Sequence, residues 1–273
     1  SRTSHFVELC ARVSEGSTNR VRLKEDKFLD STVSLPSLTE QMVIASRLDQ
    51  VSAKRSNAFL SQNNLSMSMR ALLQSAFAQL ISDAPCLPMD EVAPLVRRRV
   101  TPVMGEEYPE LGVRCFGKGT FHKPALDFMS VGTKKLYAIH PNDLVFSNVF
   151  AWEGAIAVAQ PNDEGRVGSH RFITCVPHEG IATSTFLNFY FQTPEGLAKI
   201  GKASPGGAGR NRTLGLKKLA KITVPVPPIE KQHWFDRLQA KMRTFSQLNQ
   251  KIETELDALL PSVLDRAFKG ELE

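Results

Sequence analysis

The stretch Leu35-Pro36-Ser37-Leu38-Thr39-Glu40-Gln41 has a second copy, Val226-Pro227-Pro228-Ile229-Glu230-Lys231-Gln232, 191 positions further along this chain of 273 residues. In each copy the prolines favour an extended segment, because a residue that precedes proline is disfavoured in the helical region. Apolar residues with helical spacing follow both copies. An internal repeat sets the architecture, so the sequence predicts two similar long helices with one globular stretch between them.

The first helix is expected within residues 39–84, with Thr39 as its cap. Its apolar residues follow the spacing of a coiled-coil seam, which Arg55 and Gln62 interrupt. The second is expected within 229–273, where Pro261 should kink the helix or start a new one. We expect the two helices to pack on each other as an antiparallel coiled coil, or on a second chain. An alternative is that the apolar stripes only complete the core of the middle stretch. The residues assigned to helix pairing and partner contact are Leu48, Val51, Leu65, Met69, Leu72, Leu238, Met242, Phe245, Ile252, Leu256 and Leu259.

The middle stretch, residues 85–228, is rich in turn residues and short apolar runs. Runs at 136–139, 144–146, 155–159 and 172–176 are typical of strands, and 185–192, 194–200 and 216–220 are typical of helices. The predicted fold class is therefore α+β, with one mixed α/β domain flanked by two long helices.

Residues 1–38 resemble the end of that middle domain. At the same offset their small and apolar positions fall opposite matching residues, although chance similarity over so short a span is the alternative. The matched positions are Leu9, Gly16, Leu23 and Phe28 with Ile200, Gly207, Leu214 and Leu219.

The amino-acid composition and net charge narrow the classes of protein to which this chain can belong. Hydrophobic content is 42%, charged content is 23%, and the net charge is +6 with a pI of about 9.2. Residues 90–221 hold most of the surplus, with 17 Lys and Arg against 12 Asp and Glu. This modest surplus is compatible with a polyanionic partner. No apolar run approaches the roughly 20 residues that span a bilayer, so we expect no membrane association and a cytoplasmic location.

The motifs of several enzyme classes are absent. The cysteines, Cys10, Cys86, Cys115 and Cys175, form no CxxC pair, and no HExxH spacing occurs, so no metal site is expected. There is no phosphate-binding Walker loop and no glycine-rich cofactor loop with an NPPY motif. The sequence therefore predicts no catalytic residue and no cofactor in this chain.

Four segments, 97–99, 114–123, 168–171 and 204–213, concentrate basic and polar residues at turns, as nucleic-acid-binding loops do. For any one of them, a solvated surface turn is the alternative. Trp152 is expected to anchor its own loop rather than to stack on a base. The residues assigned to DNA contact are Arg97, Arg98, Arg99, Lys118, His122, Lys123, Arg171, Arg210, Asn211 and Arg212.

Three features together resemble the specificity subunit of type I restriction-modification systems. The two copies of the repeated motif are similar to the family's "PLPPLxEQ", with Lys231 where Glu is usual. The others are Phe150-Ala151-Trp152-Glu153-Gly154-Ala155-Ile156 followed by Ser169-His170-Arg171-Phe172, and the segment from Leu259 to Leu272. The resemblance implies the C-terminal half of such a subunit. Its parts are the remnant of a first target-recognition domain (1–38), a central conserved helix (39–84), a target-recognition domain (85–228) and a distal conserved helix (229–273).

The resemblance also implies partners. The domain reads one half of a bipartite site in double-stranded DNA, and the helices dock adenine methyltransferase subunits and, indirectly, a restriction-translocase subunit. S-adenosylmethionine, Mg and ATP belong to those subunits. Two half-subunits are able to form a homodimer that reads a gapped palindrome. The alternatives are a decoy that binds the methyltransferase subunit without reading DNA, and the recognition domain of a degraded methyltransferase-nuclease.

Overall fold

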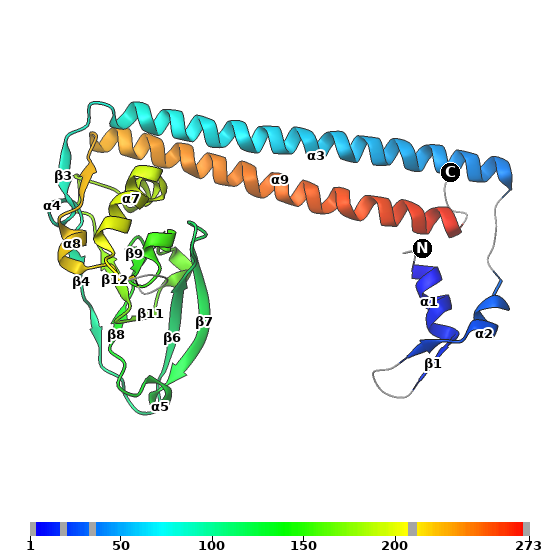
Figure 1. Ribbon diagram of the computed structural model, residues 1–273, viewed down its shortest axis with the longest axis horizontal. Helices are drawn as coiled ribbons and strands as arrows, with labels where there is room; N and C mark the ends of the chain where they lie inside the picture. The colour runs from blue at the N-terminus through cyan, green and yellow to red at the C-terminus, as the bar shows by residue number, and fades with distance from the viewer. Residues whose placement is uncertain (1–3, 17–20, 33–36, 207–211, 270–273) are drawn as a thin grey trace. The chain divides into compact units, whose positions relative to one another are not determined.

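The computed structural model describes residues 4–16, 21–32, 37–206 and 212–269, and it confirms the mixed α+β fold (Figure 1). The chain divides into two compact units. We call Ser1–Leu72 with Lys241–Glu273 the hairpin unit, and Leu73–Ala240 the central unit. Two long helices, α3 (Leu38–Ile81) and α9 (Ile229–Lys269), contribute to both units. None of the helices described is long and apolar enough to cross a bilayer.

Ser37, not Thr39, caps the start of α3. Its hydroxyl accepts a hydrogen bond from the backbone N–H of Glu40 at 3.3 Å, and the Glu40 carboxylate accepts one from the backbone N–H of Ser37 at 2.8 Å. This reciprocal pair is a capping box. Hydrogen bonds from the Ser37 side chain and then from its backbone lower the pKa of Glu40 below its ordinary value. The cap was misassigned because Ser37 and Thr39 are both residue types that begin helices, and only the side chain three residues later distinguishes them.

In the hairpin unit α3 and α9 run antiparallel, as predicted (Figure 1). The Arg55 guanidinium lies 2.5 Å from the Asp257 carboxylate, and Gln62 Nε2 donates to the backbone oxygen of Asn249 at 3.4 Å. The residue numbers of the partners on α9 decrease as those on α3 increase, so the two helices run in opposite directions. Arg55, Gln62 and Asn249 interrupt the apolar stripes, yet they lie at the contact between the two helices.

The residues assigned to helix pairing differ in how far they are covered. Met69 is buried, and Leu48, Val51, Leu238, Met242 and Leu256 are half-buried. Leu65, Leu72, Phe245 and Ile252 are between 45% and 53% exposed, and the side chain of Leu259 lies outside the described residues. Two helices touch along one narrow line, so a wide apolar stripe is only partly covered by a single partner helix.

α9 continues through Pro261, so the new helix considered from the sequence does not start there. Proline removes one backbone donor and leaves a carbonyl of the preceding turn without its partner. Pro261 is exposed, and water is able to solvate that carbonyl.

The N-terminal part of the hairpin unit contains two short helices and a two-stranded antiparallel sheet. Phe6 on the first helix meets Phe28 on the second, with ring centroids 6.3 Å apart and an edge-to-face orientation. Lys27 on the second helix forms an ion pair with Glu15 on the first strand. The elements are α1 (Ser4–Arg12), β1 (Ser14–Glu15), β2 (Arg22–Leu23) and α2 (Glu25–Leu29).

The central unit contains a four-stranded and a five-stranded sheet. The first is antiparallel, in the order β10 (Ile156–Val158), β9 (Leu144–Ser147), β12 (Phe172–Cys175) and β4 (Leu95–Val96). The second has the order β5 (Arg99–Val100), β8 (Leu136–Ala138), β11 (Val167–Ser169), β6 (Glu107–Val113) and β7 (Thr120–Asp127), with β11 parallel to β6. The short turn from β11 to β12 therefore connects the two sheets.

Two of the helices of the central unit, α6 (Ser184–Gln192) and α7 (Pro194–Ala203), begin at threonine caps. Thr183 Oγ1 accepts from the Phe186 backbone N–H at 3.1 Å, and Thr193 Oγ1 accepts from that of Gly196 at 3.2 Å. Gly196 is required by close packing, because a Cβ there would lie 2.2 Å from the Tyr190 carbonyl oxygen. The other short helices are α4 (Met89–Val92), α5 (Phe128–Val131) and α8 (Leu216–Ala220), with 3₁₀ turns η1 (Ala151–Glu153) and η2 (Pro161–Asp163).

An aromatic cluster joins the inner ends of both long helices to this domain. Phe77 of α3 lies 5.4 Å from Phe235 of α9, centroid to centroid, and both rings contact Phe186 and Phe189 of α6 at 4.8–6.2 Å. Phe77, Phe186 and Phe235 are at most 3% exposed. Aromatic pairs at these separations add about 0.5–1.5 kcal/mol each beyond the area they bury. The helices and the domain therefore share one core within the central unit.

The first and last strands of the domain are hydrogen-bonded to each other. β3 (Cys86–Pro88) pairs antiparallel with β13 (Thr223–Pro225), so the chain leaves the domain beside the point where it begins. Directly after this pair, Gln232 in the first turn of α9 is fully buried. Its amide donates to the carbonyls of Ile181 and Pro227 at 2.9 and 2.8 Å, and its oxygen accepts from the Thr183 N–H at 3.1 Å. Gln232 thus fixes the start of α9 to the loop before α6.

Candidate nucleic-acid interface

A hollow of about 510 Å³ opens in the central unit between the β6–β7 hairpin, the residues around the end of β9, and the β11–β12 turn. This volume is in the range of ligand-binding clefts. We call it the basic pocket. Its lining residues are Glu110, Gly112, Val113, Phe121, Lys123, Lys134, Ser147, Val149, Phe150, Ser169, His170, Arg171 and Phe172.

Aromatic rings and a lysine form one side of the basic pocket. Lys123 Nζ lies 5.7 Å from the ring centroid of Phe172 and 6.0 Å from that of Phe121, within cation–π range. Its charge partner is Glu110, at 3.6 Å. A Cβ at Gly112 would lie 2.3 Å from the Phe121 ring, so only glycine lets this ring lie against β6.

The turn between the sheets presents two exposed side chains, His170 and Arg171, at the edge of the pocket. The Arg171 carbonyl accepts from the Asn148 N–H at 2.7 Å, and the Arg171 N–H donates to Ser169 Oγ at 3.4 Å. Within the described part of the chain, no hydrogen bond or ion pair involves the Arg171 guanidinium. The backbone of this turn is fixed while its cationic group remains available.

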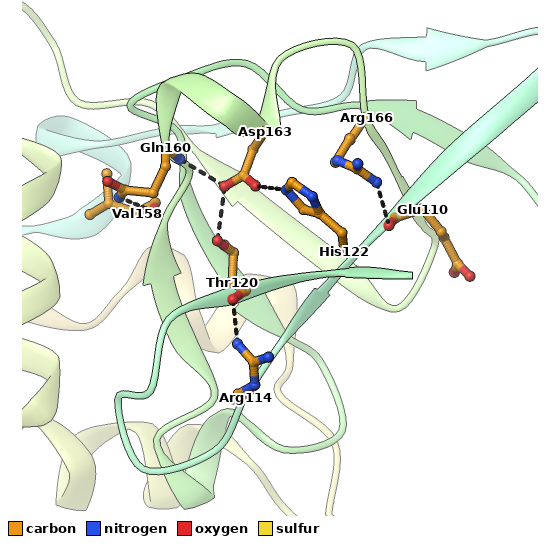
Figure 2. A network of polar contacts seen from close by, with 8 residues as sticks. All are labelled: Glu110, Arg114, Thr120, His122, Val158, Gln160, Asp163 and Arg166. Atoms are coloured by element: carbon orange, nitrogen blue, oxygen red, sulfur yellow. Dashed lines mark hydrogen bonds and ion pairs between the residues drawn. The ribbon is translucent and has the colours of Figure 1, made fainter. Parts of the chain in front are cut away.

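A buried carboxylate holds β7 against η2, as Figure 2 shows. Asp163 is 1% exposed and accepts from Thr120 Oγ1 at 2.9 Å and from the Gln160 N–H at 2.8 Å. His122 Nε2 lies 2.8 Å from its second oxygen. The imidazole of His122 is thereby committed to an internal partner, although 39% of its side chain is exposed. In the described ranges, no group of three or more His, Cys, Asp or Glu side chains is arranged to hold a metal ion.

Two solved structures match nearly the whole chain. One is the HsdS subunit from Thermoanaerobacter tengcongensis, with a TM-score of 0.61 and 19% sequence identity; the match covers 99% of this chain and 68% of the other. The fold is that of HsdS. The second comes from work on the structural basis of complex assembly and conformational transition in the type I R-M system. It has a TM-score of 0.67 and 19% identity, and covers 99% of this chain and 70% of the other. No protein-family model and no curated protein matches the sequence.

Two of the three consecutive arginines have structural partners within this HsdS fold. The Arg98 guanidinium forms a two-pronged ion pair with the buried Asp143 at 2.6 and 3.1 Å. Arg97 donates to the Phe172 carbonyl at 2.8 Å and stacks over Tyr137 at 4.6 Å. Arg99 on β5 is exposed. The basic run therefore divides into two residues that hold strands together and one that faces solvent.

The remaining residues assigned to DNA contact are spread over two regions of the central unit. Lys123 and Arg171 line the basic pocket, while Lys118 is exposed in the loop between β6 and β7. Arg212 stacks over Trp152 at 5.1 Å, and the Trp152 indole N–H donates to the Val149 carbonyl at 3.0 Å. Trp152 is half-buried and anchors its loop. Arg210 and Asn211 lie outside the described residues.

Sequence reasoning missed the aromatic side of the pocket and Lys134. Phe121 and Phe172 are adjacent to the predicted residues His122 and Arg171 along the chain. The sequence signal that could have found this side is the alternation of side chains along a strand, which puts Phe121 and Lys123 on one face of β7. Lys134 carries no motif, and only the fold brings it to the pocket.

Proposed function

We propose that this chain is a DNA-reading specificity subunit, or a large part of one, of a type I restriction-modification enzyme. The observation that carries the proposal is the HsdS fold over 99% of the chain, with the basic pocket on the domain between the long helices. On this proposal the chain does no chemistry itself. Adenine methylation and ATP-driven restriction belong to partner subunits, and the complex acts on double-stranded DNA in the cytoplasm.

The reading surface is proposed to centre on the basic pocket. An arginine with a free guanidinium is able to hold a guanine edge with two hydrogen bonds, and lysines contact phosphates. Arg171 meets the first requirement, and Lys123 and Lys134 meet the second. Arg97 and Arg98 rank lower, because contact with DNA would cost them their internal partners.

The hairpin unit is proposed to dock the methyltransferase subunit. A groove of about 490 Å³ lies between α3 and α9 in this unit. Its apolar lining includes Phe59, Leu60 and Leu256, and the ion-paired Arg55 and Asp257 also line it. Phe59 and Leu60 are 50% and 60% exposed. Exposed apolar residues of this size, with polar residues around them, are typical of protein–protein interfaces.

Residues 4–32 are proposed to be the end of another recognition domain. Shifted by 191 positions, α2 (Glu25–Leu29) coincides with α8 (Leu216–Ala220), and the first residue of α3 coincides with the first residue of α9. The last residue of α1 likewise coincides with the last residue of α7. The agreement in structure supports the sequence repeat, because chance similarity would not reproduce four element boundaries.

The direct test is methylation sequencing of a methylation-free host that expresses this chain with its methyltransferase subunit. A gapped adenine motif would support DNA reading. A palindromic motif would mean that two copies act together, and an asymmetric one that another recognition domain supplies the second half. A stable complex that methylates nothing would contradict the proposal and favour a fragment that binds the methyltransferase without addressing DNA.

Adjacent lysines provide a matched test of the pocket. Lys134 lines the basic pocket, whereas Lys135 is exposed and does not. Lys134→Ala should weaken DNA binding and reduce the salt dependence of log K by about 0.9 for each phosphate that the variant no longer neutralises. Lys135→Ala should leave that slope closer to the wild-type value. Equal effects of the two variants would mean that only the general charge of the domain matters.

A further inference from the structure

The loop between β6 and β7, residues 114–119, carries an aromatic side chain that is mostly exposed to solvent. Phe116 is 74% exposed, on a domain whose other aromatic residues are mostly buried or half-buried. Leaving a phenylalanine in water forgoes the stabilisation that burying its ring would give. A ring held in this position suits a partner that covers it.

The backbone of Phe116 is held in an unfavourable conformation. Its φ is 61°, and among the described residues it shares a positive φ, for residues other than glycine, only with Asn142. This left-handed region is disfavoured for bulky side chains, and residues kept there tend to occur at ligand-contacting sites. Two hydrogen bonds oppose relaxation: the Phe116 N–H donates to the Glu153 carbonyl at 2.8 Å, and the Gly117 N–H donates to the Gly154 carbonyl at 3.0 Å.

The support under the loop is closely packed. Gln192 Nε2 donates to the carbonyls of Gly154 and Ile156, both at 3.2 Å. A Cβ at Gly154 or Gly117 would lie 2.9 or 3.0 Å from the Gln192 side chain, so glycine at both positions lets the loop lie this close. Cys115 next to Phe116 donates to the Glu153 carboxylate at 3.3 Å. The loop is therefore a fixed platform.

One cation lies beside the exposed ring, and two more lie on this loop or against the turn that supports it. Lys118 Nζ is 6.0 Å from the Phe116 centroid. The Arg212 guanidinium stacks on Trp152, whose 3₁₀ turn provides the carbonyl that binds the Phe116 N–H. Arg114 begins the same loop and is exposed, but its guanidinium donates to the Thr120 carbonyl at 2.7 Å and stacks over Phe121 at 4.8 Å. An apolar ring beside a cation fits DNA, where base faces are apolar and the phosphates that flank them are anionic.

We propose that Phe116 is a wedge that inserts against a base step of the target DNA and unstacks it while Lys118 and Arg212 contact the flanking phosphates. The inference rests on the proposed DNA-reading function and deepens it, since it adds a contact with base faces to the reading of base edges. DNA-binding proteins that insert an apolar side chain in this way locally kink the duplex.

The test uses the full chain assembled with its methyltransferase subunit, and duplexes that carry the mapped methylation motif with 2-aminopurine at successive positions. We expect wild-type protein to raise the fluorescence several-fold at one step. Phe116→Ala should abolish that rise and weaken DNA binding by about five- to hundredfold. Phe116→Trp should retain both properties.

Met129→Ala is the matched control, because Met129 on α5 is 82% exposed on the same domain but lies outside this loop. It should behave as wild type, and thermal melting should show that all the variants fold. Wild-type binding without fluorescence change, or a Phe116→Ala variant indistinguishable from the control, would overturn the wedge and leave DNA reading intact. Loss of methyltransferase binding in Phe116→Ala, with the fluorescence rise retained, would identify a protein contact instead. A wild-type complex that does not bind the duplex would overturn both proposals.

Discussion

The two copies of the repeat form helices at equivalent positions but bury them differently. α2 and α8 occupy equivalent positions, yet Leu23 before α2 is 47% exposed whereas its equivalent Leu214 before α8 is 1% exposed. In the central unit the elements of the second copy pack against the rest of the domain, and in the hairpin unit the described residues supply no such cover. Local sequence is therefore sufficient to define helices and their ends, while the core depends on residues far away in the sequence.

The largest expected difference is in stability. Leu214→Ala should lower the free energy of unfolding by about 2–5 kcal/mol, because it leaves a cavity in a closed core. The equivalent Leu23→Ala should change it by less than about 0.5 kcal/mol. Urea unfolding followed by far-ultraviolet circular dichroism measures both. A large loss from Leu23→Ala would mean that another polypeptide covers this residue in solution, and the comparison would fail.

Replacing the glutamine of the repeated motif should also cost more stability in the second copy than in the first. Gln232→Ala would leave two carbonyls and one N–H without partners inside the protein, at a cost of about 1–3 kcal/mol. Gln41, its equivalent at the start of α3, is half-buried, and Gln41→Ala should cost less. Hydrogen exchange in the first turns of α9 and α3 localises each effect. Similar losses at both positions would show that the motif acts alike in both copies.

The repeat explains how much of the fold the sequence predicts. Both long helices, and the helices and strands expected in the middle domain, lie within a few residues of their expected ends, because period and caps are local signals. β6 and β7 were missed because each contains a proline, Pro109 or Pro124. β7 is an edge strand, where proline is tolerated, and the register of β6 shifts between Pro109 and Leu111.

The candidate site was less predictable than the fold. Arg98 pairs with Asp143, 45 residues away, and no local pattern distinguishes it from the exposed Arg99. The basic pocket is assembled from the β6–β7 hairpin, the end of β9 and the β11–β12 turn, which are far apart in the sequence. Composition thus identified the basic loops. Contacts between residues far apart in the sequence decide which of the basic side chains in those loops have internal partners and which face solvent.

The ion pair between the two long helices should contribute less to the free energy of unfolding than either buried side chain, Leu214 or Gln232. Arg55 and Asp257 are 46% and 56% exposed, so water and salt screen their attraction. A double-mutant cycle of Arg55→Ala and Asp257→Ala should give a coupling of roughly 0–1 kcal/mol that declines with added salt. A larger, salt-insensitive coupling would indicate that the hairpin groove is closed in solution.

The smallest expected effect concerns the different starts of the two helices. Ser37 caps α3, whereas its equivalent at the start of α9 is Pro228. Ser37→Ala should raise the pKa of Glu40 back toward its ordinary value, since the hydrogen bonds from the Ser37 side chain and then from its backbone lower it. Because that pKa is lowered, the cap stabilises α3 above the ordinary pKa of Glu40 and loses this effect as the pH falls through the lowered value.

Carbon-detected NMR titration of Glu40 measures this change. Thr39→Ala, in the same turn but outside the capping box, is the control and should leave the pKa of Glu40 lowered. An unchanged pKa in Ser37→Ala would show that the capping box does not form in solution.

The pairing of β3 with β13 has an evolutionary consequence. Because the chain leaves the domain beside the strand through which it arrived, everything between these strands is an insertion with both ends at one point. Such insertions tolerate replacement, since a different intervening sequence with the same two end strands preserves the register of α3 against α9. Recombination within the coding sequence of the two long helices would therefore exchange the whole domain as a cassette while the remaining scaffold is retained.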